Sequence, residues 1–157
     1  MNLEKYSHLA FFSGLLVEDI QLLAPYFISQ TWVAGTVIFE QDDYAEYLYL
    51  VVNGEVTIRY KPHDGPMMTV TRVLPGGIFG WSAAMNNPAY TSGAVCSLDS
   101  EVLRIRGTDL REIMQKHPKL GKILLDRLAG VIAERKRVQQ GPVSTILANG
   151  MRYPNKD

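Results

Sequence analysis

The amino-acid sequence predicts a mainly β domain with flanking helices. Its middle part, residues 29–106, consists of short β-rich segments separated by Gly, Pro, Asn and Asp, whereas the segments on either side carry apolar residues at helical spacing. With 157 residues and 46% hydrophobic content, the chain suits one domain with a sizeable core. We therefore expect one domain over residues 1–140, with a helical lead-in at 1–28, β structure at 29–106 and helices at 108–140. Residues 141–157 form a short, aperiodic tail that we expect to be loosely ordered.

The lead-in is predicted to contain an amphipathic helix. Apolar residues recur there at steps of three and four, and Glu18 and Asp19 lie near the N-terminal end, where the helix dipole favours negative charge. The apolar set is Val17, Ile20, Leu23, Ala24 and Phe27. The helix is therefore expected over residues 17–27.

The β region is predicted to fold into antiparallel strands, because its segments are short and closely spaced. Asn53-Gly54 favours a tight hairpin between the strands on either side of it, since both central residues of such a turn need a positive φ. After this turn, Val56, Ile58 and Tyr60 alternate with Thr57 and Arg59, which indicates one buried face. The expected strands are Thr31–Val33, Val37–Phe39, Tyr47–Val52, Glu55–Tyr60, Thr69–Leu74, Tyr90–Ser97 and Glu101–Arg106.

Two helices are expected after the strands. The first covers residues 108–116 with Thr108 as its N-cap, and the second begins at Pro118 and runs to about Gln140, where Gly141-Pro142 ends it. The second helix has an apolar stripe of Leu120, Leu124, Leu128, Val131 and Ile132, which Ile123, Leu125, Ala129 and Ala133 extend around the cylinder.

Composition limits the partners and the location. Sixteen basic and sixteen acidic residues give no net charge, which argues against long-range attraction to nucleic acid or anionic lipid. A single cysteine, Cys96, fits a reducing cytoplasmic setting, and we expect it to be buried and inert. No apolar run approaches a membrane span, and fewer than about twenty residues follow the last helix, too few for a DNA-binding helix-turn-helix. We expect neither a DNA nor a membrane partner.

Three motifs, Ala34–Phe39, Tyr49–Val56 and Pro75–Gly80, follow the predicted helix and precede the last two helices. In this order and spacing they resemble the cyclic-nucleotide-binding domains of the catabolite-activator and protein-kinase regulatory-subunit type. The resemblance covers roughly residues 7–137. It implies an antiparallel β-roll, a jelly-roll-like double-stranded β-helix, and a regulatory rather than an enzymatic role without a cofactor.

The resemblance also implies a phosphate-binding cassette after Phe79-Gly80. In that family a glutamate accepts a hydrogen bond from a ribose hydroxyl. A short helix offers backbone amides to the cyclic phosphate, and an arginine pairs with the phosphate. Here Trp81 takes the place of the glutamate and Tyr90 that of the arginine, and no residue from Pro75 to Leu98 is charged. The cassette residues of this chain are Phe79, Gly80, Trp81, Ser82, Ala83, Tyr90, Thr91 and Ser92, with Ser82, Ala83 and Ala84 on the expected short helix.

Two functions are compatible with this cassette. In the first, a stand-alone regulatory module binds a nucleotide-like or aromatic small molecule against Trp81 and Tyr90, but not cyclic AMP or cyclic GMP tightly. In the second, the two aromatic residues fill the pocket themselves, and the domain serves interaction or dimerisation. Arg59, Arg72 and Arg104 are the nearest cations, and we expect them on the solvated face.

No other set of residues indicates catalysis or metal binding. His8, His63 and His117 lack the spacing of metal ligands, and we expect them at the surface. Related domains dimerise through the helix that corresponds to residues 118–140, so the excess apolar surface there predicts a homodimer. Alternatively, the N-terminal segment covers that surface within the same chain, with Leu9, Phe11, Phe12, Leu15 and Leu16.

Overall fold

The computed structural model describes residues 2–139, which fall into two compact units, one up to Lys122 and one from Ile123 onward. The predicted end of the last helix at Gly141-Pro142 and the predicted tail lie outside the described residues. The single domain over residues 1–140 stays a prediction.

The first unit begins with helical segments: η1 (Leu3–Tyr6), α1 (Val17–Leu23) and η2 (Ala24–Tyr26). The predicted helix is confirmed over its first seven residues and then tightens into a 3₁₀ turn at Pro25, which has no N–H for an α-helical hydrogen bond. Ile20, Leu23 and Phe27 are buried as expected, but Val17 is 55% exposed.

The segment before α1 packs within the first unit. Leu9, Phe11 and Phe12 are buried, and the Phe12 ring meets Phe27 edge to face with 5.3 Å between ring centroids. Leu16, in contrast, is 65% exposed. These phenylalanines therefore pack into the core of their own chain.

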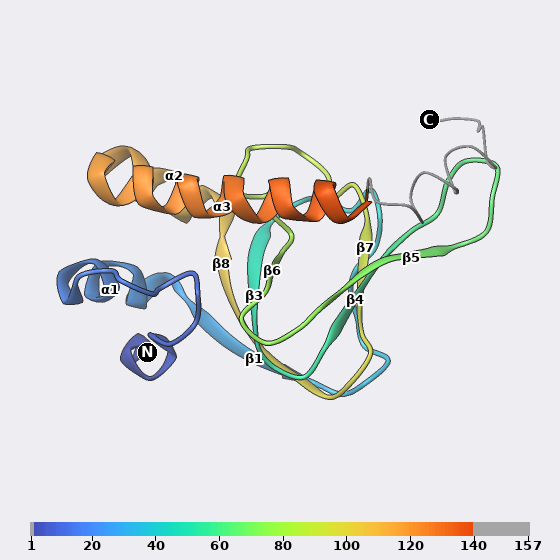
Figure 1. Cartoon of the computed structure of the whole chain (residues 1–157), viewed down its shortest axis with the longest axis horizontal. Helices are drawn as coiled ribbons and strands as arrows, with labels where there is room; N and C mark the ends of the chain where they lie inside the picture. The colour runs from blue at the N-terminus through green and yellow to red at the C-terminus, as the bar shows by residue number, and fades with distance from the viewer. Residues whose placement is uncertain (1, 140–157) are drawn as a thin grey trace. The chain divides into compact units, whose positions relative to one another are not determined.

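The strands form two antiparallel sheets, the predicted β-rich architecture with flanking helices (Figure 1). One sheet has the order β1-β8-β3-β6 and the other β2-β7-β4-β5. All seven expected strands are present, β2 with the predicted ends and the other six with shifted ends, while two-residue β6 was too short to be recognised in the sequence. The strands are β1 (Ile28–Trp32), β2 (Val37–Phe39), β3 (Tyr47–Asn53), β4 (Val56–Tyr60), β5 (Met68–Val73), β6 (Ile78–Phe79), β7 (Gly93–Cys96) and β8 (Ser100–Arg106).

The predicted hairpin at Asn53-Gly54 is wrong. β3 pairs with β6 and β8, whereas β4 pairs with β5 and β7, so this turn carries the chain from one sheet to the other. Gly54 has a φ of +91°, but Asn53 is not among the described residues with positive φ, and a type I′ turn needs both. A Cβ on Gly54 would overlap the Asp99 carbonyl oxygen and the Ser100 hydroxyl. The crossing is therefore defined by close backbone approach.

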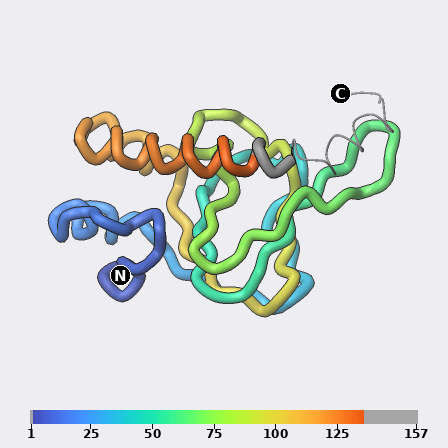
Figure 2. The backbone as a smooth tube through the Cα atoms, viewed as in Figure 1, coloured from blue at the N-terminus to red at the C-terminus, as the bar shows by residue number. Residues whose placement is uncertain are grey.

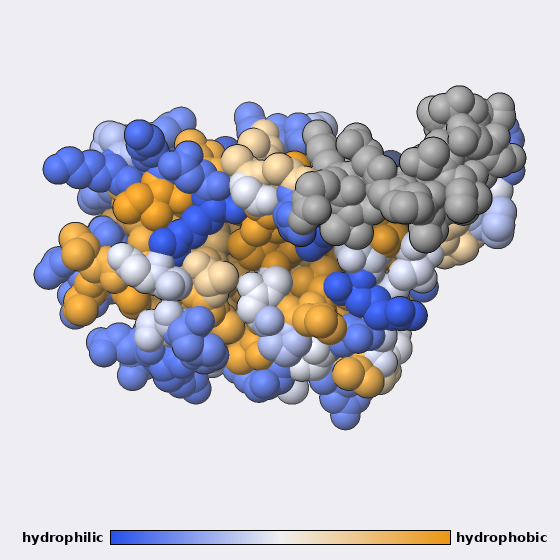
Figure 3. Space-filling view, in the orientation of Figure 1, coloured by the Kyte–Doolittle hydropathy of each residue, from blue (hydrophilic) through white to orange (hydrophobic). Residues whose placement is uncertain are grey.

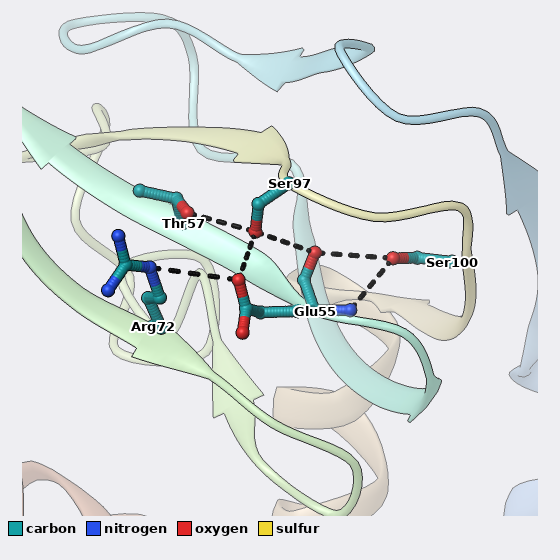
Figure 4. A network of polar contacts seen from close by, with 5 residues as sticks. All are labelled: Glu55, Thr57, Arg72, Ser97 and Ser100. Carbon is teal, nitrogen blue, oxygen red and sulfur yellow. Dashed lines mark hydrogen bonds and ion pairs between the residues drawn. The ribbon is translucent and has the colours of Figure 1, made fainter.

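A polar network joins this crossing to the β7–β8 turn (Figure 4). The Ser97 hydroxyl donates to the Glu55 carboxylate at 2.7 Å, and the Thr57 hydroxyl donates to Ser97 at 3.0 Å. The Glu55 backbone N–H donates to Ser100 Oγ at 3.1 Å. Arg72 lies 3.7 Å from the Glu55 carboxylate but is 64% exposed, so it adds little. The network holds the two turns together.

The interior between the sheets is hydrophobic and rich in aromatic residues. Val56 and Ile58 of β4 belong to it, as their alternation predicted, although Tyr60 at the end of the strand is 37% exposed. The buried members are Phe39, Ala45, Tyr49, Val51, Val56, Ile58, Val73, Phe79, Ala83, Tyr90, Ala94 and Val102.

Two helices follow the strands, α2 (Gly107–Lys116) and α3 (Pro118–Gln139). The expected Thr108 cap is wrong, because the helix starts one residue earlier, with Arg106 as its N-cap residue and no side-chain cap. In the second unit, Leu124 and Leu128 are buried, whereas Ile123 and Leu125 are 38% and 45% exposed. Leu128 is therefore unavailable for a dimer interface.

Within residues 2–139, no helix combines the length and the hydrophobicity that crossing a bilayer requires. On the face of the molecule shown in Figure 3, hydrophobic and hydrophilic residues lie next to one another.

Candidate functional site

The cassette segment, residues 79–92, runs from the end of β6 to the start of β7. Gly80 has a φ of +77°, and a Cβ there would lie only 3.0 Å from the Tyr47 carbonyl oxygen. After it come hydrogen-bonded turns rather than the short helix expected at Ser82–Ala84. A helix cannot extend through this segment, because Asn86 has a φ of 60° and Pro88 has no N–H. The prediction of a cassette helix is therefore wrong.

Tyr90 lies inside the β-roll. It is 4% exposed, and its ring stacks on Phe39 with 3.6 Å between centroids. Its hydroxyl donates to the Tyr47 carbonyl oxygen at 2.6 Å and accepts from the Tyr47 N–H at 3.0 Å. Burial raises the pKa of the Tyr90 phenol far above its usual value, so the hydroxyl stays protonated. Tyr90 thus acts as a neutral core residue that bridges to β3.

Further aromatic rings continue this stack. Tyr49 lies against Phe79 at 4.9 Å with nearly parallel planes, and Phe39 contacts both rings. Burial raises the pKa of the Tyr49 phenol, and this effect outweighs the nearby positive charge of Arg104, which lowers it. The aromatic stack beside the cassette therefore consists of uncharged rings, with Arg104 next to Tyr49.

The remaining predicted cassette residues divide into two groups. Ser82 and Ala83 are buried, at 6% and 2% exposure, and Ala83 belongs to the same hydrophobic cluster as Phe79 and Tyr90. Trp81 and Ser92 are partly exposed, and Thr91 is exposed. The structure thus brings Phe79, Ala83 and Tyr90 together, while Thr91 faces solvent.

Arg104 does not lie on the solvated face, contrary to expectation. It is paired with Tyr49 in the β3–β8 register, it shares its side of β8 with buried Val102, and its guanidinium lies 4.1 Å from the centroid of the Tyr47 ring. The alternation of Arg104 with apolar neighbours predicted a solvated position wrongly, because both faces of β8 are covered. Leu103 and Ile105, on the opposite face, are buried as well. Arg72 is 64% exposed as expected, and Arg59 is 28% exposed.

The cassette turn packs closely against α2 and is hydrogen-bonded to it. A Cβ on Gly107 would overlap the Ala83 carbonyl group, and Arg111 donates a hydrogen bond to the Ala83 carbonyl oxygen. The Gly107 N–H also donates to the Glu46 carbonyl oxygen at 2.9 Å, and Glu46 forms an ion pair with Arg106 at 2.7 Å. Sequence reasoning missed this contact, for which a glycine at a helix start was the only local signal.

The cysteine and the three histidines lie as the sequence predicted. Cys96 is buried, and burial raises the pKa of its thiol, which makes it less reactive. His8, His63 and His117 are exposed. Among the residues that the structure describes, no group of His, Cys, Asp and Glu is placed to hold a metal ion.

A groove of about 510 Å³ lies at the base of the β4–β5 hairpin. It is lined by residues 40–42, which follow β2, by the end of β4, by the first residue of β7 and by the β4–β5 connection. Figure 2 shows this connection as a long excursion from the strands. Arg59, Lys61 and His63 occupy alternating positions in the sequence, and this alternation is the local pattern that indicates the groove.

Comparison with known proteins identifies the family. The model of the cyclic nucleotide-binding domain matches residues 29–117. The cyclic AMP receptor protein of Thermus thermophilus is 29% identical over 126 residues, which are 80% of this chain and 56% of the relative. A solved cyclic nucleotide-binding protein from Geobacter metallireducens is 30% identical with a TM-score of 0.77, over 86% of this chain and 98% of that one.

A cyclic nucleotide-binding domain from Methylobacillus flagellatus shares the fold with a TM-score of 0.78 at 20% identity, over 99% of this chain and 87% of that one. The chain spans about half the length of the Thermus relative, at 56%. Together with the two-sheet roll and the position of the cassette, the match over residues 29–117 establishes that this chain belongs to the family of cyclic nucleotide-binding domains.

Proposed function

We propose that this chain is a regulatory domain that does not bind cyclic AMP or cyclic GMP tightly, because its own aromatic side chains occupy the nucleotide site. The observation that carries the proposal is the burial of Tyr90, stacked on Phe39 at 3.6 Å and hydrogen-bonded to Tyr47 at both backbone groups. A cyclic nucleotide would have to displace this ring and break both hydrogen bonds.

The charge of the site supports the same proposal. From Pro75 to Leu98 the chain carries no charged residue, so the cassette offers neither a carboxylate for a ribose hydroxyl nor a guanidinium for the phosphate. Two cations from other segments lie close by, and both are already engaged: Arg104 lies over the Tyr47 ring, and Arg111 donates to the Ala83 carbonyl oxygen. Of the two functions compatible with the sequence, the one in which Tyr90 fills the pocket has this support.

Calorimetric titration with cyclic AMP and cyclic GMP is expected to detect no tight binding. The two missing charge-assisted contacts are each worth roughly 1.5–3 kcal/mol, so their loss weakens binding by orders of magnitude. Cooperative thermal unfolding of the same sample serves as the control for folding. A dissociation constant at or below about 1 μM for either nucleotide would contradict the proposal.

We also propose that the chain forms a homodimer through residues 118–140. Ile123 and Leu125 of α3 support this, because both are exposed apolar residues on a helix. Light scattering at about 50 μM protein is expected to give a dimeric mass that Leu125→Glu reduces to a monomer, since a buried charge without a partner disrupts an apolar interface. Lys116→Glu, at an exposed position of α2 outside the proposed interface, is the matched control. A monomeric mass for the unmodified chain would rule out this dimer.

A further inference from the structure

The groove at the base of the β4–β5 hairpin lies outside the aromatic interior. Its lining residues are Glu40, Gln41, Asp42, Arg59, Tyr60, Lys61, Pro62, His63, Met67 and Gly93. None of these belongs to the buried cluster around Tyr90. At about 510 Å³ its size is within the range of small-molecule sites. The groove is therefore a candidate site separate from the cassette.

The groove is held in shape by backbone contacts. The side-chain amide of Gln41 donates to the Lys61 carbonyl oxygen at 3.1 Å and accepts from the Lys61 N–H at 2.8 Å, so one side chain pairs with both backbone groups. Gly93 faces Arg59 in the β4–β7 register. On the other wall, the Asp42 N–H donates to the Tyr90 carbonyl oxygen at 2.9 Å. The groove is consequently preformed.

Arg59 is the lining residue that can receive an anionic group of a ligand. Its Nε is buried and has no hydrogen-bond partner among the described residues. One of its terminal nitrogens lies 3.7 Å from the Glu40 carboxylate, beyond hydrogen-bond distance, and the Glu40 side chain is 61% exposed. The side chain is 28% exposed, so its terminal N–H groups, rather than the buried Nε, can donate to the carboxylate of a ligand.

The other charges of the groove balance Arg59. Glu40 and Asp42 oppose Arg59 and Lys61, and the Lys61 ammonium already donates to the Gly65 carbonyl oxygen at 3.1 Å. The Asp42 carboxylate is exposed. A ligand that is only anionic would meet these two carboxylates, whereas an ammonium group on the ligand would pair with them.

The remaining wall is apolar. Tyr60 and Met67 are 37% and 49% exposed, and Pro62 lies between them in the sequence. These side chains gain by covering apolar surface of a ligand. We propose that the groove binds a zwitterionic α-amino acid or dipeptide with an apolar side chain, whose carboxylate pairs with Arg59 and whose ammonium pairs with Glu40 and Asp42.

The test is a titration followed by NMR, with free L-leucine, L-methionine, L-phenylalanine and leucyl-leucine as probes. At least one zwitterion is expected to shift the amide signals of Arg59, Lys61 and Gly93. N-acetyl-leucine and leucinamide each lack one of the two charges. Each is expected to bind with an affinity about 10-fold or more below that of free leucine. The titration also includes acetate and inorganic phosphate as probes. Neither is expected to bind at the concentrations at which the zwitterions bind.

Arg59→Gln is expected to weaken binding by about 10- to 100-fold, because it removes the charged donor. Arg72→Gln is the matched control, since Arg72 is on the neighbouring strand, 64% exposed and not in the groove lining, and it should leave binding unchanged. The proposal is overturned if no zwitterion binds, if the blocked analogues, acetate or phosphate bind equally well, or if folded Arg59→Gln binds as the parent does. Should Arg59→Gln not fold, the comparison of free and blocked probes on the unmodified chain still decides the question.

Discussion

Replacing Tyr90 by alanine is expected to lower the free energy of unfolding by about 3–5 kcal/mol, the range for removing a large buried aromatic side chain. The change deletes a ring that is 4% exposed and stacked on Phe39, and it leaves a cavity next to Tyr49 and Phe79. It also leaves the Tyr47 N–H and carbonyl group without their partner. Urea unfolding followed by circular dichroism measures the change.

Tyr90→Phe separates the two contributions. It keeps the ring and removes the hydroxyl, so the cost is that of unsatisfied backbone groups, about 1–3 kcal/mol. Thr91→Ala, at the exposed neighbouring position, is expected to have little effect, within about 0.5 kcal/mol. If Tyr90→Ala proved as mild as Thr91→Ala, Tyr90 would not be the core residue described above.

Replacing Gly54 by alanine is expected to be the other strongly destabilising change. The backbone φ of +91° is unfavourable for any residue with a Cβ, at a cost of about 1–2 kcal/mol. In addition, the new Cβ would overlap the Asp99 carbonyl oxygen and the Ser100 side chain, and such overpacking costs about 1–3 kcal/mol more.

Gly35→Ala is the matched control for this substitution. Gly35 has the same φ of +91°, but a Cβ there would meet nothing within 4 Å. The difference between the two variants in urea unfolding therefore isolates the close approach at the sheet crossing. Equal destabilisation of both would mean that backbone strain alone explains the role of Gly54.

The crossing at Gly54 also illustrates the limit of local sequence patterns. Asn53-Gly54 between two β-rich segments is typical of a hairpin, yet β3 and β4 belong to different sheets. The sequence indicates that a turn with a positive φ occurs here. It does not indicate which strands pair across it, because pairing depends on contacts with β6, β7 and β8 that are distant in the chain.

Burial on both faces of a strand caused the error at Arg104. Alternation predicts an outward side chain only where one face of the sheet is wet. Leu103 and Ile105 are buried on one side of β8 and Val102 on the other, so Arg104 shares the inner side with Val102. The cation–π contact with the Tyr47 ring then stabilises the charged guanidinium of Arg104 in this position.

The sequence by itself determined seven of the eight strand segments, the helices before and after them, the family motifs and the uncharged cassette, because each depends on residue type and short-range spacing. Only the tertiary structure decided that Tyr90 lies inside the roll against Phe39, that Arg104 faces inward and that Arg59 lines a groove with Glu40. Whether a side chain lies in the core or meets a ligand depends on residues brought together from distant strands, and no local pattern encodes that proximity.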